Sequence, residues 1–572
     1  MMKMINAAAC GERELEALWA ESDARFLRRL IMAEEYDDQK KHEGLPSLVY
    51  EGSESIKRFR SRQIFLRSYP FDKEKTIDTI TQRTKKWLKM AKENAKNGGS
   101  SSLKAYCPEY HPTLEEFDDP LLYLQKIAPE ASKYGICKVV SPLKASVPAS
   151  DVLTKEIEDF NFGTYIQPLR LPKWNTNDRG IFFEGNRKYT YDSFESMATE
   201  ALKLQSPRLG DLPPSYIEKK FWLEMIHGNE GRVEYGVNIE GSAFSSDPDD
   251  QLGKCKWHLK GITDPMLYIG MLFSIFAWHV EDHYLYSINY HHSGAPKTWY
   301  GVPGDDAVAF ERVALKHVYS RNILSRVGED GAFEEIAKKT TMFPPKLLMD
   351  NGVHVYKAVQ KPGEFVITFP RVYHAGFSNG FNCGEAVNFA TADWFPFGEA
   401  AGKRYAHLRT RVIVPYEELL LKESMILYGK CLTHEEALDN SEAKLAFSVR
   451  ASFLQHIRCL NNTIRCLNNL KIPFSHFPNS QGSIVCEICG RECYLAFIEC
   501  SNLSCQQRMC LFHEFKKRKC SCERKRTVFL REDIQQVEAA AKRFAEEEHL
   551  NVISCIEEGL ATHTARTRAR TR

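Results

Sequence analysis

Two histidines and one acid have the types and the spacing of a metal site for oxidative chemistry. His279 and Glu281 are separated by one residue, and His374 follows in the segment 368–377. Two imidazoles and one carboxylate form the facial triad that binds Fe(II) and leaves coordination positions open, where a 2-oxo acid and O₂ can bind. The three residues therefore predict oxidation. The alternative is a core histidine and a surface His-x-Glu pair without a metal.

A second group of metal-ligand residues lies toward the C-terminus. It contains eight thiolate and imidazole ligands, which suit two tetrahedral Zn(II) ions. These ions would hold a segment that has too little apolar mass to fold by itself. The alternative is a set of reduced structural cysteines. The eight side chains are Cys486, Cys489, Cys500, Cys505, Cys510, His513, Cys520 and Cys522.

The elements that must position the triad are predominantly strands. Residues 233–405 alternate short aromatic and β-branched runs with Gly and Pro, which favours a β-sandwich or barrel, with one helical piece near 305–317. The pattern predicts a strand at 136–140, an amphipathic helix at 215–226 and helix at 434–470. We expect a mainly β fold with flanking helices, of the α+β class.

Length and composition limit the classes of protein. With 572 residues, the chain is long enough for three or four structural units. Its longest apolar stretch, 265–278, is shorter than the roughly 20 residues that cross a bilayer. The 17 cysteines, odd in number and clustered, suit a reducing compartment. We expect an intracellular protein without a membrane segment.

Positive charge is clustered although the net charge is only +2. Such clusters could meet nucleic acid non-specifically or an import receptor, and a solvated basic face is the alternative. The clusters are 84–89, 516–519 with 524–526, and the alternating arginines of 566–572.

The sequence around the triad resembles the jumonji C (JmjC) family of Fe(II)- and 2-oxoglutarate-dependent oxygenases, in its histone lysine demethylase branch. The motifs that carry the resemblance are YLYSINY at 284–290 and GAPKTWYGVP at 294–303, between the two halves of the triad. The resemblance implies a double-stranded β-helix (jelly-roll, cupin) barrel. It also implies that His279, Glu281 and His374 are the catalytic Fe(II) ligands.

The same resemblance assigns the co-substrate pocket residue by residue. Lys297 matches the lysine that pairs with the distal carboxylate of 2-oxoglutarate, and a buried cation offsets the desolvation of that group. Tyr268 matches the aromatic residue that contacts the methylammonium of the substrate lysine. The hydrogen-bonding partners are Tyr235, Asn289 and the weaker candidate Ser287, and the apolar walls, or plain barrel core, are Phe276 and Trp299.

The implied reaction is the oxidative removal of N-methyl groups. 2-Oxoglutarate is decarboxylated to succinate with O₂, an N-methyl carbon is hydroxylated, and the product releases formaldehyde. No lone pair on nitrogen is needed, so trimethyllysine can be a substrate. The expected partners are the methylated histone H3 tail and chromatin in the nucleus, with trimethylated lysine 27 as the first expectation and lysine 9 or lysine 4 as alternatives. A JmjC protein hydroxylase and a non-catalytic scaffold are the other classes considered.

Two flanking segments resemble known modules. Residues 106–148 are similar to the JmjN segment, and 486–536 to the C5HC2 zinc finger, a combination found in a plant demethylase group. The spacing favours interleaved ligation, with Cys493 as a spare ligand. One ion would then take Cys486, Cys489, Cys510 and His513, and the other Cys500, Cys505, Cys520 and Cys522.

The remaining boundaries follow from these modules. The expected divisions are a variable region 1–100, JmjN 106–148, a mixed αβ linker 149–232 that packs on the barrel, JmjC 233–405, a helical region 406–480, the zinc finger 486–536 and a helical and basic tail 537–572. The segment 391–398 has no Cys-x-Cys, which some JmjN–JmjC demethylases use for an additional zinc site. Their substrate preferences therefore do not transfer to this chain.

Overall fold

The computed structural model describes the central and C-terminal parts of the chain. All of these residues fall within the unit Asp78–Arg572. The predicted region 1–100, Cys520, Cys522 and the basic clusters, apart from Arg526, lie outside the described residues. The described ranges are 105–155, 160–171, 182–205, 212–228, 231–244, 264–319, 331–410, 412–429, 441–500, 502, 505–513 and 526–547.

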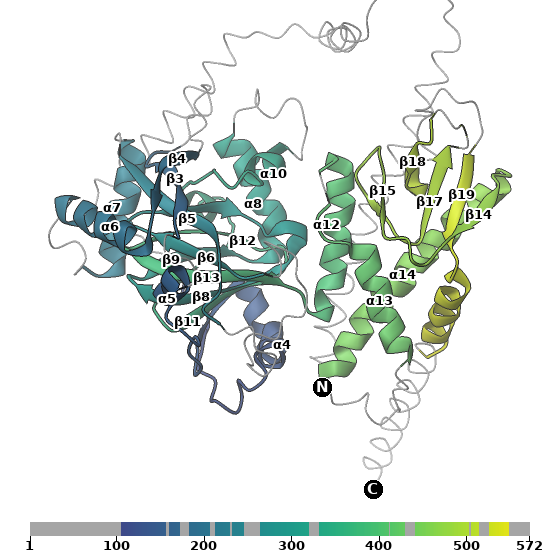
Figure 1. Ribbon diagram of the computed structural model, residues 1–572, viewed down its shortest axis with the longest axis horizontal. Coiled ribbons are helices and arrows are strands. Elements are labelled where there is room, and N and C mark those ends of the chain that lie inside the picture. The colour runs from purple at the N-terminus through teal and green to yellow at the C-terminus, as the bar shows by residue number, and fades with distance from the viewer. Residues whose placement is uncertain are drawn as a thin grey trace, which may run out of the picture. The chain divides into compact units, whose positions relative to one another are not determined.

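Two sheets form the barrel that carries the triad (Figure 1). Buried side chains of both sheets meet in one hydrophobic core, which includes Ile269, Trp278 and Tyr300, and others, such as Val366 and Trp299, lie in a second core. The expected α+β fold with a jelly-roll barrel is confirmed. The nine-stranded sheet has the order β1 (Glu109–Tyr110), β2 (Ile136–Val140), β11 (Glu364–Thr368), β8 (Tyr286–Gly294), β13 (Asn382–Phe389), β6 (Met266–Gly270), β5 (Arg232–Glu240), β3 (Phe162–Pro168) and β4 (Phe183–Tyr189). The four-stranded sheet has the order β10 (Tyr356–Gln360), β9 (Lys297–Val302), β12 (Tyr373–Ser378) and β7 (Ile275–His279).

The segment expected to be JmjN extends the larger sheet. Its strand β2 pairs antiparallel with β11, with Ile136 opposite Thr368. Helix α4 (Pro120–Ala131) begins at Asp119, whose side chain accepts a hydrogen bond from the backbone N–H of Leu122 at 3.0 Å. Proline at the first helical position fits this start because it needs no N–H partner there. The segment is thus built into the sheet that also holds β8.

Among its described residues, the mixed region before the barrel contains two strands and three helices. Strands β3 and β4 close one edge of the larger sheet, and β4 is the edge strand, with mostly exposed side chains. An exposed edge strand carries no apolar alternation, so no sequence pattern predicts it. Helix α7 buries Ile217, Phe221 and Met225 at a spacing of four and ends at Gly228 in the left-handed conformation. The helices are α5 (Ala149–Lys155), α6 (Tyr191–Gln205) and α7 (Pro214–His227).

Several short helices surround the barrel, and one of them packs on the four-stranded sheet. The expected helical piece near 305–317 is present as two elements, α8 and the π-helical η7, and its Phe310 stacks on Tyr373 of β12 at 4.2 Å. The short helices are η3 (Ser132–Tyr134), η5 (Asp282–Tyr284), η6 (Gly304–Asp306), α8 (Ala307–Val313), η7 (Ala314–Val318), α10 (Gly331–Ile336), α11 (Pro345–Met349) and η9 (Ala392–Trp394).

Three long helices precede a small C-terminal sheet (Figure 1). They are α12 (Phe395–Leu408), α13 (Tyr416–Gly429) and α14 (Ser441–Asn469). The range expected to be helical, 406–480, also contains β14, because this segment pairs with β19. No helix of the described residues is long and apolar enough to span a membrane. The remaining elements are β14 (Phe474–Phe477), β15 (Ile484–Val485), β16 (Glu492–Cys493), β17 (Ala496–Cys500), β18 (Arg508–Met509), η10 (Leu511–His513), β19 (Arg526–Arg531) and a helix at 534–547.

Candidate active site and cysteine cluster

The three predicted iron ligands meet where β7 and β12 pair. His279 ends β7 and stands directly opposite His374 of β12. Glu281 is the second residue after the strand, and its Oε1 lies 3.9 Å from His279 Nε2 and 3.4 Å from His374 Nε2. All three ligand atoms lie within 4.8 Å of one another. The arrangement offers two imidazole nitrogens and one carboxylate oxygen to a single ion.

Backbone carbonyls fix the orientation of both imidazoles. His279 Nδ1 donates to the carbonyl of Ala277 at 2.7 Å, and His374 Nδ1 donates to the carbonyl of Val372 at 3.2 Å. Because Nδ1 carries the proton, Nε2 of each ring keeps its lone pair, as a metal ligand requires.

The protonation states of the cluster also suit a metal ion. Burial and the neighbouring His374 lower the pKa of His279 to about 3, so this ring is neutral. Burial alone would raise the pKa of Glu281, but His374, His279 and Lys339 hold it below its usual range. A neutral imidazole beside an ionised carboxylate suits the binding of a divalent cation.

A buried histidine anchors the turn after Glu281. His283 has a positive φ of 53°, and its Nε2 accepts hydrogen bonds from the backbone N–H groups of Ile413 at 3.1 Å and Val414 at 3.4 Å. Its ring stacks on Tyr405 at 4.5 Å. His283 therefore has a structural role.

Two further histidines near the motif are also buried outside the triad. His291 Nε2 donates to the carbonyl of Ala295 at 3.0 Å, and His292 Nε2 pairs with Glu385 at 2.8 Å. Their imidazoles are therefore engaged elsewhere in the fold.

Lys297 is a buried cation without an anionic partner among the described residues. Its Nζ lies 3.2 Å from the hydroxyl oxygen of Tyr235, and 5.5 Å and 6.0 Å from the ring centroids of Tyr235 and Phe276. Burial lowers the pKa of Lys297 to about 8. A Cβ added to Gly384 would lie 3.5 Å from this Nζ. A carboxylate that entered here would recover the electrostatic cost of the buried ammonium.

The other residues assigned to the pocket lie on β7, β8 and β9. Asn289 Nδ2 donates to Ser287 Oγ at 3.3 Å, and Ser287 is hydrogen-bonded to Thr368 at 2.6 Å. The ring of Trp299 lies 4.4 Å from that of Phe276 and 6.2 Å from that of His374. Phe276 and Trp299 thus form an apolar surface that links the surroundings of Lys297 to the triad.

Tyr268 stands on β6 beside this group. Its ring lies 6.4 Å from that of Tyr235, and desolvation, Tyr235 and Glu281 together raise the pKa of its phenol. Its hydroxyl donates to Asn238 Oδ1 at 2.9 Å. In the sheet, Tyr268 is directly opposite Gly384, which has no side chain to fill the space.

Sequence reasoning missed two sets of residues around the triad. Lys339 Nζ lies 3.6 Å from Asp282, the neighbour of Glu281 in the chain. Arg404 binds both oxygens of Glu311 at 2.7 and 2.8 Å, and Glu311 also accepts from the hydroxyl of Tyr373, next to His374. These contacts join separate elements, and no motif spacing signals them.

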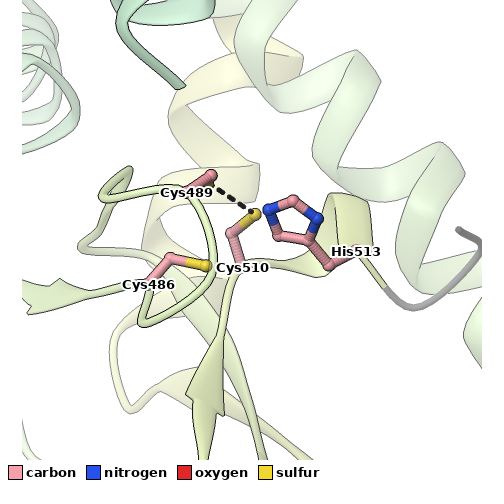
Figure 2. A group of neighbouring side chains, drawn as sticks. All are labelled: Cys486, Cys489, Cys510 and His513. Carbon is pink, nitrogen blue, oxygen red and sulfur yellow. Dashed lines mark hydrogen bonds between the residues drawn. The ribbon is translucent and has the colours of Figure 1, made fainter. Parts of the chain in front are cut away.

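Four side chains of the C-terminal group converge (Figure 2). Cys486, Cys489, Cys510 and His513 bring their ligand atoms within 4.8 Å of one another, and the sulfurs of Cys489 and Cys510 lie 4.0 Å apart. The first two cysteines follow β15, whereas Cys510 follows β18 and His513 ends η10. This is one of the two four-residue sets that the interleaved pairing predicts, and its donors suit tetrahedral zinc.

The second predicted set is only partly described. Cys500 ends β17 and is buried, and Cys505 is half-buried, whereas Cys520 and Cys522 lie outside the described residues. The spare candidate Cys493 is buried on β16, and its sulfur lies 3.8 Å from the carbonyl of Arg491. Cys493 is not part of the cluster in Figure 2.

Two family descriptions match the chain in the regions just described. Residues 266–389 match the family described as "JmjC domain, hydroxylase", and residues 108–141 match the jmjN domain. The first match spans the strands that carry the triad, Lys297 and Tyr268.

Named relatives come from plants. The lysine-specific demethylase JMJ706 of Oryza sativa subsp. japonica is 48% identical over 496 residues, which cover 83% of this chain and 56% of the relative. JMJ705 of the same organism is 37% identical over 367 residues, covering 55% of this chain and 28% of the relative. The lysine-specific demethylase REF6 of Arabidopsis thaliana is 33% identical over 377 residues, covering 55% of this chain and 27% of the relative.

The chain spans about half the length of JMJ706 and about a quarter of the other two relatives. The matched regions coincide with the extended sheet and with the barrel site. The chain carries a JmjN domain followed by a JmjC domain, and it is similar to lysine-specific demethylases of plants.

Proposed function

We propose that this protein is an Fe(II)- and 2-oxoglutarate-dependent lysine demethylase that acts on methylated histone H3. The observation that carries the proposal is the pairing of a His-Glu-His cluster with an uncompensated buried lysine inside one barrel. The cluster suits Fe(II), and the lysine suits the distal carboxylate of a 2-oxo diacid. Similarity to proteins named lysine-specific demethylases supports the substrate class.

The metal ligands in this proposal are His279, Glu281 and His374. Both histidines can offer Nε2 because their Nδ1 protons are committed to backbone carbonyls. When bound, Fe(II) would supply the activation of O₂ that makes oxidation of an N-methyl group possible. The protein fixes the geometry of three ligands and leaves the other positions to the two co-substrates.

The 2-oxoglutarate subsite lies around Lys297. The ammonium and the hydroxyl of Tyr235 would bind the distal carboxylate, and Asn289 with Ser287 would orient the co-substrate. Phe276 and Trp299, whose rings are in contact, would exclude water between this anchor and the metal. Tyr268 would receive the methylammonium group of the substrate lysine, because an aromatic face and a hydroxyl oxygen both favour polarised N-methyl groups.

The substrate lysine is the finer part of the proposal. We propose trimethylated lysine 27 of H3 first, with lysine 9 and lysine 4 as the alternatives, and chromatin in the nucleus as the place of action. The printed names of the relatives say only that they are lysine-specific demethylases. Contact with nucleic acid through the basic clusters is a further expectation.

A panel of mono-, di- and trimethylated H3 peptides tests the function. The protein is incubated with Fe(II), ascorbate and 2-oxoglutarate, and the products are measured by mass spectrometry. We expect losses of about 14 mass units per methyl group from the lysine-27 peptides, because each N-demethylation replaces a methyl group with a hydrogen. Losses from lysine-9 or lysine-4 peptides would replace the substrate and keep the reaction.

The alternative hypothesis, a JmjC protein hydroxylase, predicts a different product. A stable gain of about 16 mass units without formaldehyde would mean that oxygen is retained on a carbon, and would contradict the demethylase proposal. A lack of any product despite bound iron would favour a scaffold.

We also propose that the C-terminal cluster binds zinc as a structural site. Cys486, Cys489, Cys510 and His513 would hold one ion, and Cys500, Cys505, Cys520 and Cys522 a second. Elemental analysis of the purified protein tests this, with about two zinc ions per chain expected for the eight ligands. One ion would contradict the interleaved second site.

A further inference from the structure

A bulge in β5 brings Asn238 to the mouth of the candidate site. The register between β5 and β6 shifts between Gly236 and Ile239, and Asn238 adopts a left-handed backbone with φ of 54°. Asparagine is among the few non-glycine residues that tolerate this conformation. The bulge re-aims its side chain across to the neighbouring strand, where its Oδ1 accepts a hydrogen bond from Tyr268 at 2.9 Å.

This hydrogen bond decides how the Tyr268 hydroxyl faces the site. A phenol carries one hydrogen and can both donate and accept. While the hydrogen is donated to Asn238 Oδ1, the lone pairs of the phenol oxygen remain free to accept. The phenol stays protonated because desolvation, Tyr235 and Glu281 raise its pKa.

An oxygen that only accepts suits a methylated ammonium. Trimethyllysine offers polarised C–H groups and no N–H, so it can make only weak C–H···O contacts. Dimethyllysine has one N–H in its protonated form, and this stronger donor could reorient a free hydroxyl by itself. A Tyr268 hydroxyl that is already oriented before the substrate binds should therefore help the trimethyl substrate more than the dimethyl substrate.

We propose that Asn238 is a positioning residue that holds the Tyr268 hydroxyl as an acceptor and thereby favours trimethyllysine over dimethyllysine. This inference rests on the proposed demethylase function. Asn238 acts through Tyr268, not through the reacting atoms. On the paired strand, Gly384 stands directly opposite Tyr268 and carries no side chain of its own there.

Two substitutions at position 238 separate the effect of the Asn238 hydrogen-bond acceptor from the effect of the left-handed backbone conformation. N238G removes the acceptor and keeps the positive φ without strain, and N238D keeps both an acceptor and tolerance of this φ. Each variant is made in the wild-type and the Y268F background, and kcat/KM is measured on trimethyl and dimethyl peptides of the best substrate. The melting temperature of each variant reports on folding.

We expect N238G to lower the ratio of trimethyl to dimethyl kcat/KM by about threefold, as the loss of weak C–H···O contacts implies. N238D should restore the ratio. In the Y268F background, N238G should leave the ratio unchanged, because the hydroxyl that it orients is already absent.

The remaining outcomes distinguish failure of this inference from failure of the proposed function. An unchanged ratio in N238G, with active wild-type protein, overturns the inference and leaves the proposed function intact. An equal drop in the Y268F background shows that Asn238 contacts the peptide directly, which also overturns it. If the wild-type protein removes no methyl group from any peptide while it retains bound iron, the proposed function fails and the inference fails with it.

Discussion

The two candidate metal centres differ in what holds their ligands. His279 and His374 stand on paired strands of the barrel, backed by the buried rings of Trp278, Tyr300 and Tyr373. The cysteine cluster instead lies next to β15 and β18, which have two residues each. The paired strands can hold the triad in place without an ion, whereas the cysteine cluster, although its cysteines are buried in a hydrophobic core, joins short elements that an ion would hold together. The comparison separates a preorganised reaction site from a structural one.

Removal of zinc should have the largest effect and be confined to the C-terminal module. A structural Zn(II) site contributes on the order of 10 kcal/mol to folding. We expect a zinc chelator, or C489S, to abolish the thermal transition of the module while the transition of the barrel remains. Differential scanning calorimetry measures both. The matched control is C466S, an exposed cysteine on α14 outside the cluster.

Loss of an iron ligand should have the opposite pattern. H279A should lower turnover by roughly 1000-fold, because the metal supplies the O₂ chemistry, and should leave the melting temperature nearly unchanged. Formaldehyde release measures turnover, and H227A on the exposed end of α7 is the control. Barrel unfolding in H279A would contradict the preorganised site.

Replacement of the buried lysine should affect the co-substrate alone. K297M removes the cation that we assign to the distal carboxylate, so the KM for 2-oxoglutarate should rise by about 100-fold with less change in peptide KM. Steady-state succinate production measures this. K133M, at an exposed lysine on η3, should leave the KM unchanged. Equal losses for peptide and co-substrate would place Lys297 in a general structural role.

The smallest effect should come from the ion pair between α13 and α14. His456 Nε2 lies 2.7 Å from Glu417, whose other oxygen accepts from the backbone N–H of Leu495 at 3.0 Å. Although burial would lower the pKa of His456, Glu417 raises it above the ordinary 6.5. Burial would raise the pKa of Glu417, but His456 holds it below 4.5.

The directions of the two pKa shifts determine how the stability contributed by this ion pair changes with pH. The contribution of His456 is complete below pH 6.5 and is lost as pH rises through its raised pKa, whereas that of Glu417 is lost as pH falls below 4.5. H456Q should therefore cost about 2 kcal/mol near pH 6 and less at pH 9. Urea unfolding at both pH values measures the difference, and a cost that grows with pH would contradict this assignment.

Sequence reasoning predicted the local part of the site better than its surroundings. His279, Glu281 and Lys297 fall in short motifs whose spacing is visible in the chain, and the strand at 136–140 has a clear β-branched run. Strand β4 gave no apolar pattern because it lies exposed at a sheet edge. Asn238 was invisible because its role depends on a bulge in strand register, which no residue spacing reveals.

Coupled product analysis tests the central claim most directly. Wild-type protein is supplied with a trimethyl-lysine H3 peptide, and succinate, formaldehyde and peptide mass are followed together. We predict formaldehyde in step with succinate and with stepwise loss of methyl mass, all absent in H279A. Succinate formed with an oxygenated peptide and no formaldehyde would contradict demethylation at the barrel site.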